Sequence, residues 1–272
     1  MKKPVSVESE LRPDTAGLLA DVAELYYKDG LTQHDIAQRI GVSRPTVVNY
    51  IKQAREQGIV DIQIRGSAYK GSNLSRQLCE KYGLVDVYIA RTAAEKDQAV
   101  AQIKLARLGA MALSDLLREH DVLGVSWGRT IQLAATEFPR RPIKHLTVSQ
   151  LVGSVPTDAL FATEESTIRI AKRTGAKCNT LPVPAILSTV QLAEQLRAEP
   201  IVQKHLSQFT KLTKVIFSVG DLSDESMVYD IGMHTKAEWE TYKSQGAKGV
   251  LVGRLVDDRG DVLDSDFNQR IL

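Results

Sequence analysis

Cysteine, net charge and long apolar runs are all scarce in this sequence of 272 residues. Its two cysteines, Cys79 and Cys178, are far apart, which excludes a cysteine-based metal motif and favours reduced thiols. No window approaches the length of an apolar membrane span, and the first residues, MKKPVSVESELRPD, lack the apolar run of a signal peptide. We therefore expect a cytoplasmic protein without a membrane segment.

A net charge of only +2 gives no global signal for a polyanionic partner. The sequence also lacks a Walker A loop and a dinucleotide-binding fingerprint. Hydrophobic residues make up 43% of the chain and charged residues 25%, which is ordinary for globular proteins. The length is sufficient for more than one domain. Any nucleic-acid site must therefore depend on a local motif.

Residues 31–58 contain the most informative motif of the chain. They predict two short helices joined by a turn at Gly41, because glycine readily adopts the left-handed conformation that such a turn needs. Thr32 is suited to cap the first helix and Ser43 the second. A preceding amphipathic helix over about 14–28 completes a three-helix unit. The pattern is typical of a DNA-binding helix-turn-helix.

The second helix of the motif is predicted to have an apolar inner face, with Val47, Val48, Ile51 and Ala54 toward the core. Its outer face carries residue types that contact bases and phosphates. Helix pairs with a glycine turn also occur in proteins that never bind DNA, but this outer face and the third helix favour DNA binding. The predicted DNA-contacting residues are Thr32, Gln33, Ser43, Arg44, Thr46, Asn49, Tyr50 and Lys52.

The positive charge of this motif is local. From Met1 to Arg65, nine basic residues are balanced by nine acidic residues. A monomer would therefore bind DNA weakly, since affinity grows with the number of phosphates neutralised. We expect a homodimer or homotetramer that places two recognition helices on neighbouring turns of the major groove.

The rest of the chain predicts an α/β fold class. The alternation over 59–64 indicates a short strand, and the stretch RGSAYKG resembles a linker. Helical and strand patterns then alternate to the end, which favours a mostly parallel sheet covered by helices. Helices are expected over 72–82, 95–119, 129–137, 163–174, 189–198, 201–208 and 236–245, and strands over 85–90, 122–126, 144–151, 177–181, 214–219 and 249–255, with a turn at 257–260 closing a final hairpin. The expected domains are a DNA-binding domain (1–65), a linker (66–71) and an effector-binding and oligomerisation domain (72–272).

A strand, a turn and a helix start follow one another in VLGVSWGRT, residues 122–130. Backbone N–H groups at such a helix start favour an anion, the glycines permit close approach, and the arginine offers a fork of donors to phosphate. A lone glycine turn of this kind is more often a purely structural connection. The candidate effector-binding residues of this segment are Gly124, Ser126, Trp127, Gly128, Arg129 and Thr130.

Polar residues also follow three other predicted strands. In parallel sheets, ligands bind beyond the carboxyl ends of the strands. Carboxylates and an amide suit sugar hydroxyls, which both donate and accept hydrogen bonds, although each such residue alone is more often an ordinary loop residue. The further candidates are Gln150, Gly153, Gly220, Asp221 and Asp257. Together with the turn above, they predict a site for a phosphorylated sugar or polyol.

Four segments make the chain resemble the SorC family of sugar-sensing bacterial transcriptional regulators, which is also described as DeoR-related. They are LLADVAELYYKDGLTQHDIAQRIGVSRPTVVNYIKQAREQGIVDIQI, VLGVSWGRT, VSQLVGS and GVLVGRLVDDRG, and they extend over almost the whole chain. The resemblance implies a Rossmann-like effector domain with the fold of phosphosugar isomerases and glucosamine-phosphate deaminases. It also implies a phosphorylated effector, and a dimer or tetramer on palindromic operator DNA. It places Gly124–Thr130 near the phosphate, and Gln150–Gly153 and Asp257 at strand ends that face the sugar.

The sequence departs from that family at its end. Members usually continue for some tens of residues, through a glycine-rich turn with a lysine and two more helices, whereas this sequence ends at Leu272 after DSDFNQRIL. We therefore expect the effector domain to be incomplete at this end, with part of its pocket, including that lysine, outside the sequence.

Three functions are compatible with these patterns. The first is a regulator of a carbohydrate or polyol catabolic operon. The second is a sugar-phosphate isomerase or deaminase fused to a helix-turn-helix, for which Asp221, His234 and Asp257 are available as general bases, although their spacing singles out no acid–base pair. The third is an interaction scaffold. The DNA-binding motif favours the regulator, so we predict no catalytic residue, no cofactor and no metal site.

Overall fold

The structure is a computed structural model that describes residues 13–60, 62, 72–92, 97–155, 163–223, 226 and 234–272. The chain divides into two compact units, Met1–Gln63 and Ile64–Leu272. Each unit has hydrophobic clusters of its own.

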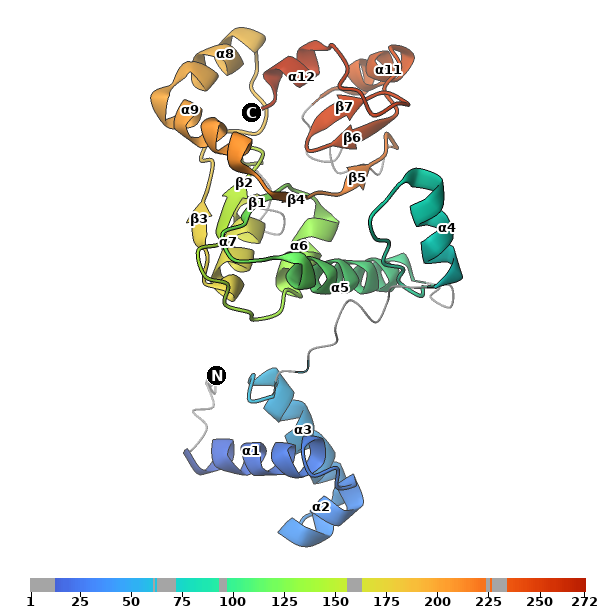
Figure 1. Cartoon of the computed structure of the whole chain (residues 1–272), viewed down its shortest axis with the longest axis vertical. Coiled ribbons are helices and arrows are strands. Elements are labelled where there is room, and N and C mark those ends of the chain that lie inside the picture. Colours follow the sequence, from blue (N-terminus) through green and yellow to red (C-terminus); the bar gives the residue numbers. More distant parts are fainter. Residues whose placement is uncertain are drawn as a thin grey trace, which may run out of the picture. The chain divides into compact units, whose positions relative to one another are not determined.

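Three helices form the first unit, namely α1 (Pro13–Tyr27), α2 (Gln33–Ile40) and α3 (Arg44–Glu56) (Figure 1). All three contribute to one buried cluster, which contains Val22, Ile36, Ala37, Val47 and Ile51. A smaller cluster of Leu19, Ala23 and Ala54 joins α1 to the end of α3. The predicted three-helix unit is confirmed.

Short polar contacts fix the turn between α2 and α3. Thr32 Oγ1 accepts a hydrogen bond from the Asp35 N–H at 3.2 Å, and the Thr32 N–H donates to Asp35 Oδ2 at 3.3 Å, which makes a reciprocal capping box. Gly41 has φ 71° and ψ 33°, the left-handed conformation expected of it. Ser43 Oγ then accepts from the Thr46 N–H at 3.3 Å and caps α3. The sequence therefore fixes where α2 ends and α3 begins.

A four-stranded parallel sheet is the centre of the second unit (Figure 1). Its strands are β1 (Val122–Val125), β2 (Thr147–Gln150), β3 (Lys177–Asn179) and β4 (Lys214–Ile216), in the order β3-β2-β1-β4. Residues of α5 (Gln98–Leu116), α6 (Arg129–Thr136) and α7 (Thr163–Thr174) share one core with β1 and β2. The predicted α/β architecture is confirmed for this part of the chain.

A second, antiparallel sheet follows in the chain. It contains β5 (Val219–Gly220), β6 (Gly249–Leu251) and β7 (Arg254–Val256), in that order. Its core is built around Trp239 and Phe267, both fully buried, from α11 (Lys236–Ser244) and α12 (Asp266–Arg270). The remaining elements are α4 (Asn73–Tyr82), α8 (Val190–Ala198), α9 (Pro200–Leu206) and the 3-10 helix η2 (Ser207–Lys211).

Three strand predictions are wrong. The predicted strand 249–255 is a hairpin of β6 and β7, turning at Val252 and Gly253, whose φ angles are 50° and 81°. The predicted strand 214–219 divides between two sheets, as β4 and β5. The segment 85–90 forms no strand, and Val85 is 96% exposed. The alternation of apolar and polar residues in this segment therefore does not mark the buried face of a sheet.

The predicted wing strand over 59–64 lies only partly within the described residues. Ile59 and Val60 follow α3 in a turn, with Val60 packed on the smaller cluster of the first unit. Asp61, residues 63–64 and the predicted linker lie outside the described residues. The helix predicted over 95–119 begins at Gln98, capped by Asp97, and ends at Leu116.

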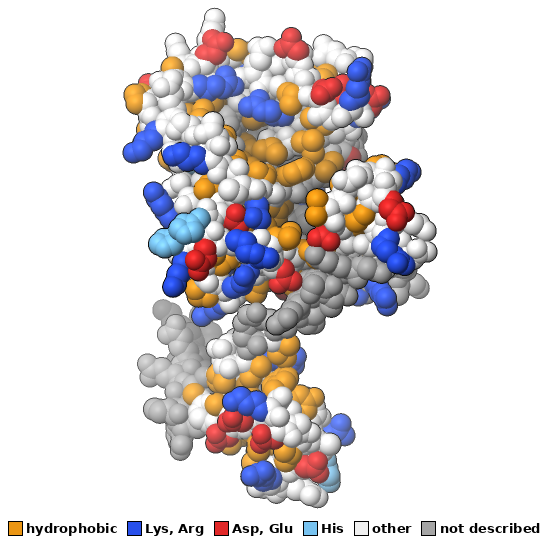
Figure 2. Space-filling view, in the orientation of Figure 1, with side chains coloured by type: hydrophobic (Ala, Val, Ile, Leu, Met, Phe, Trp, Pro, Cys, Tyr) orange, Lys and Arg blue, Asp and Glu red, His pale blue; other side chains and the backbone are white. Residues whose placement is uncertain are grey.

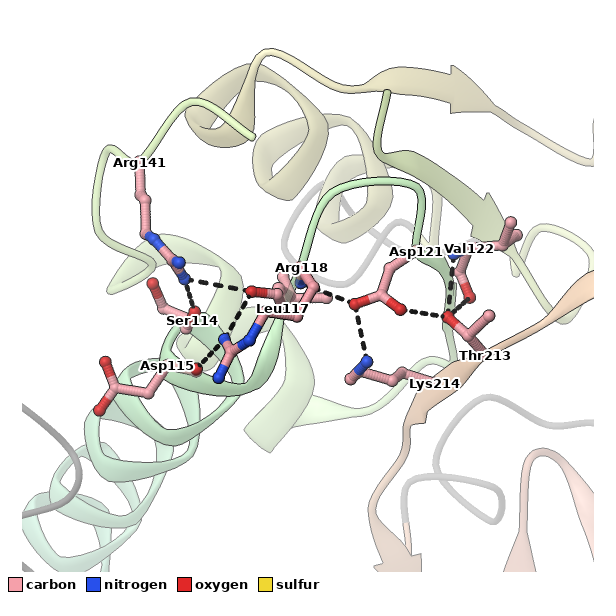
Figure 3. Close-up of polar contacts among 9 residues, drawn as sticks. All are labelled: Ser114, Asp115, Leu117, Arg118, Asp121, Val122, Arg141, Thr213 and Lys214. Carbon is pink, nitrogen blue, oxygen red and sulfur yellow. Dashed lines mark hydrogen bonds and ion pairs between the residues drawn. The ribbon is translucent and has the colours of Figure 1, made fainter. Parts of the chain in front are cut away.

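A buried carboxylate connects the start of β1 to β4. Asp121 is 7% exposed and accepts hydrogen bonds from Lys214 Nζ, Thr213 Oγ1 and the Arg118 N–H, each at 2.7 Å (Figure 3). Burial acts to raise the pKa of Asp121, but these hydrogen bonds outweigh it and hold the pKa below its usual value. Figure 3 also shows Arg118 and Arg141 directed at carbonyls in the last turn of α5, where cations stabilise a helix end.

Hydrophobic side chains gather over β4 and β5 (Figure 2). Val215, Phe217 and Val219 occupy alternate positions of this segment and are 42%, 47% and 74% exposed. Among the described residues, β1 is the one strand that pairs with β4, so β4 forms one edge of the parallel sheet. That edge is therefore apolar.

Candidate nucleic-acid interface and effector site

The buried and exposed faces of helix α3 are largely those that the sequence predicts. Val47, Ile51 and Ala54 are buried, whereas Arg44, Asn49 and Lys52 are exposed. Ser43 is exposed and Thr46 half-buried. The predicted reading face of α3 therefore lies on the surface of its unit.

Two residues of α3 lie differently from the prediction. Val48 is 45% exposed, so its predicted inward position is wrong, and Tyr50 is half-buried against both clusters of the unit. The reason is helical geometry, since each residue turns the helix by about 100°. Val48 lies about 100° from Val47, outside the buried stripe, whereas Tyr50 lies only about 60° from Val47 on the other side.

A side-chain hydrogen bond joins the first residues of α2 and α3. Arg44 Nε donates to Gln33 Oε1 at 3.3 Å. Both residues, together with Thr32 and His34, line a hollow of about 590 Å³ on this unit. The structure thus brings together three predicted DNA-contacting residues from two helices, and the Gln33 amide fixes the direction of the guanidinium.

The charge of α3 is partly neutralised within the helix. Lys52 Nζ lies 3.6 Å from a Glu56 carboxylate oxygen, and these side chains are 64% and 60% exposed. An exposed pair of this kind contributes little to stability. It does reduce the net positive charge that the reading face presents to phosphates.

The turn after β1 is packed against the ends of other strands. The Ser126 N–H donates to the carbonyl of Ile216, the last residue of β4, at 3.0 Å. Gly128 has φ 132°, and a Cβ at this position would lie 2.6 Å from Ser218 Oγ. A Cβ on Gly253 would lie 3.4 Å from Nε1 of Trp127, which is 6% exposed. This turn therefore meets both the segment after β4 and the β6–β7 hairpin.

Arg129 and Thr130 begin α6 directly after this turn. Arg129 is exposed, and Thr130 Oγ1 accepts a hydrogen bond from Gln102 Nε2 at 3.1 Å. Gly124 lies within β1, where an added Cβ would come within 2.7 Å of the Leu151 side chain. Ser218 is a neighbour of the turn that the sequence analysis missed. Its position two residues beyond β4 is the signal that could have identified it.

Gln150 and Gly153 hold the chain beyond β2. Gln150 is fully buried, and its Nε2 donates to the Val152 carbonyl at 2.8 Å while its Oε1 accepts from the Leu181 N–H at 3.0 Å. A Cβ on Gly153 would lie 2.4 Å from the Val183 carbonyl oxygen. In this arrangement the amide serves the backbone, and the glycine permits two chain segments to approach. Their contact with an effector stays a prediction.

The carboxylates of Asp221 and Asp257 stabilise turns. Hydrogen bonds from Ser223 lower the pKa of Asp221, and those from the Arg259 and Asp261 N–H groups lower the pKa of Asp257. Gly220 lies in β5, and Asp257 follows β7 of the antiparallel sheet. The sequence analysis placed Asp257 at a carboxyl end of the parallel sheet. That placement is wrong, because the strand before Asp257 belongs to the antiparallel sheet.

The three candidate general bases form no acid–base pair in this arrangement. His234 packs on Trp239, with ring centroids 4.1 Å apart, and burial lowers its pKa. The two aspartates are engaged in the turns described above. Within the described ranges, no three histidine, cysteine or acidic side chains come together as a metal-ligand set. No helix in that part of the chain is long and apolar enough to cross a membrane.

Comparison with known proteins identifies both parts of the chain. Residues 68–272 match the family model "Putative sugar-binding domain", and residues 18–71 match the model "HTH domain". The chain belongs to the SorC family of sugar-binding transcriptional regulators. A SorC-family regulator combines a DNA-binding helix-turn-helix with a sugar-binding domain, and both matches lie where the structure has the corresponding fold.

Individual relatives extend over most of the chain. It is 36% identical to the transcriptional regulator YjhU of Escherichia coli (strain K12), over 91% of this chain and 77% of that relative. It is 26% identical to the deoxyribonucleoside regulator of Bacillus subtilis (strain 168), over 94% of this chain and 81% of that relative. The crystal structure of the full-length sorbitol operon regulator SorC from Klebsiella pneumoniae has the same fold, with a TM-score of 0.73 at 23% identity, and covers 96% of this chain and 84% of its own.

Proposed function

We propose that this SorC-family member regulates an operon for carbohydrate or polyol catabolism, and that a phosphorylated sugar or polyol controls its binding to operator DNA. The observation that carries the proposal is the outward face of α3, with Arg44, Asn49 and Lys52 exposed on a compact three-helix unit. Relatives named for sorbitol and deoxyribonucleosides support the class of effector.

The residues of this face have complementary roles in DNA recognition. Arg44, held by Gln33, is suited to donate two hydrogen bonds to guanine in the major groove. Asn49 is suited to pair with adenine, and Lys52 to contact a phosphate. Thr32 and Gln33 line the hollow at the start of α2 and are suited to contact the sugar-phosphate backbone of the DNA beside the bases that α3 reads. Base selectivity then depends on Arg44 and Asn49, whereas Lys52 contributes affinity at any sequence.

The effector site is proposed at the start of α6. Gly128 is the residue before this helix and leaves its first N–H groups available to an anion, with Arg129 beside them. Ser126, Thr130 and Ser218 add hydroxyl groups around the same turn. A phosphate at the helix start, with the sugar hydroxyls toward the segments after β2 and β4, is the arrangement that these residues favour.

Regulation requires that the effector bind two arrangements of the protein with different affinities. We propose a homodimer or homotetramer in the cytoplasm in which effector binding changes the separation of two α3 helices. Because half-sites must match that separation, a small change alters operator affinity. The protein would catalyse no reaction, since the carboxylates of Asp221 and Asp257 stabilise turns and His234 packs on Trp239.

The experiment is an effector titration on selected DNA. The full chain first selects duplexes from a random pool, and fluorescence anisotropy then measures affinity for the enriched duplex with and without a panel of sugar phosphates and their unphosphorylated parents. We expect one phosphorylated compound to change the affinity and its parent to have no effect. Arg129→Ala should lose this response while Lys172→Ala, a change on the exposed face of α7, keeps it. Conversion of the compound into a product would contradict the proposal, as would equal responses to phosphorylated and unphosphorylated forms.

A further inference from the structure

A pocket of about 420 Å³ lies between β3 and α9, in the second unit. Its walls come from β3, from the segment that follows β3 and from α9 and η2. None of the residues at the proposed effector turn lines this pocket. Its volume falls within the range of small-molecule sites, about 300–1,000 Å³.

The pocket has an apolar floor and a basic rim. Leu181, Val183 and Val202 form the floor and are 1%, 9% and 2% exposed. Lys177 and Lys204 stand at the rim, and both are exposed. None of the lining residues is acidic, and neither lysine forms an ion pair within the part of the chain that the structure describes. Apolar walls with a few convergent cations suit an anion that carries an apolar body.

A fixed histidine closes the inner side of the pocket. The Gln150 carbonyl can only accept a hydrogen bond, so His205 Nε2 is the donor in their contact of 2.8 Å. The His205 ring also packs edge-on against Phe209, with centroids 5.6 Å apart. Gln150 in turn accepts from the N–H of Leu181 in the pocket floor. The pocket is thus built from held side chains, and both His205 and Leu181 contact the last residue of β2.

We propose that this pocket binds a small carboxylate or phosphate ester with an apolar body, at a site separate from the turn before α6. Lys177 and Lys204 hold the charged group, and the apolar floor takes the body of the molecule. The inference goes beyond the proposed effector site, because it depends on none of the residues between Gly124 and Thr130.

Cys178 makes the site accessible to a direct test, because it lines the pocket and is exposed. In the full chain with Cys79→Ser, the rate of Cys178 alkylation by iodoacetamide is measured with increasing benzoate, phenyl phosphate or benzamide. Benzoate and benzamide have the same shape, but only benzoate is charged. We expect one of the two anions to slow alkylation in a saturable way and benzamide to have no effect.

Matched lysine variants test whether the rim lysines are responsible for protecting Cys178 from alkylation. Lys177→Gln and Lys204→Gln should each weaken protection by about tenfold, the effect of losing one charge-assisted hydrogen bond. Lys211→Gln, on η2 outside the lining, should protect as the parent chain does. Circular dichroism establishes that each variant is folded. Equal protection by benzamide, no protection by either anion at millimolar concentration, or unchanged protection in both rim variants would overturn the proposal.

Discussion

Replacing Asp121 with asparagine should destabilise the sugar-binding unit by about 2–4 kcal/mol. The carboxylate is 7% exposed and accepts three hydrogen bonds of 2.7 Å, one of them from the Lys214 ammonium. Each hydrogen bond to a charged group contributes about 1.5–3 kcal/mol, and asparagine can retain only part of the set because its amide nitrogen donates. The Lys214 side chain is 29% exposed and regains some hydration, which limits the loss.

Tryptophan fluorescence during urea denaturation measures the loss of stability caused by Asp121→Asn, and it reports on the second unit alone. The only two tryptophans of the chain, Trp127 and Trp239, are both buried in the second unit. Asp258→Asn serves as the control, since Asp258 is an exposed aspartate in the 257–260 turn.

The effect of Asp121→Asn should also depend on pH. The lowered pKa of Asp121 means that its contribution is complete above the unfolded-state pKa of about 3.9 and is lost as pH falls through the folded-state value. The difference between the parent chain and the variant should therefore be full at neutral pH and shrink below about pH 4. A difference within ~0.5 kcal/mol at neutral pH, the size of an ordinary surface substitution, would refute the reasoning.

Three further predictions concern the glycines and the two sites. Gly153→Ala should destabilise the second unit by at least about 2 kcal/mol, because its Cβ would lie 2.4 Å from a carbonyl oxygen, whereas Gly109→Ala in α5, with open space around it, should stabilise by about 0.5–1 kcal/mol. Urea denaturation followed by tryptophan fluorescence measures the stability of both variants. Equal stabilities of Gly153→Ala and Gly109→Ala would contradict this prediction. Arg44→Ala should reduce selectivity between the selected duplex and a scrambled one by about 1–3 kcal/mol. Gln33→Ala should reduce the same selectivity by less than Arg44→Ala does. The double variant should lose no more selectivity than Arg44→Ala alone, and additive losses in anisotropy titrations would show that the two side chains act independently. Arg129→Ala should weaken the effector response without changing DNA affinity, and an unaltered effector titration would exclude a phosphate contact at this residue.

Local signals determined how much of the first unit was predictable. Thr32, Gly41 and Ser43 define the ends of α2 and α3 by contacts within three or four residues, so the sequence alone locates both helices. Val48 and Tyr50 lie at the boundaries of the buried stripe. Their exposure depends on how α1 packs against α3, and the pattern of α3 by itself does not contain that information.

The second unit was predictable in class but less so in its strands. The β6–β7 hairpin was missed because its turn is Val252–Gly253, and valine at φ 50° is not a residue that signals a turn. The segment 249–255 therefore resembled one apolar strand. Gln150 has the polarity of a ligand-binding residue, yet its amide is engaged by the Val152 and Leu181 backbone, a contact across 31 positions of chain that no local pattern reveals.

The most direct test of the account is selection of random duplexes by the full chain and by a variant with Arg44→Ala and Asn49→Ala. The account predicts that the parent chain enriches a symmetric pair of half-sites about one helical turn of DNA, or a multiple of it, apart. The variant, with an unchanged circular dichroism spectrum, should enrich none. Enrichment of the same half-sites by the variant would contradict the claim that the outward face of α3 reads DNA.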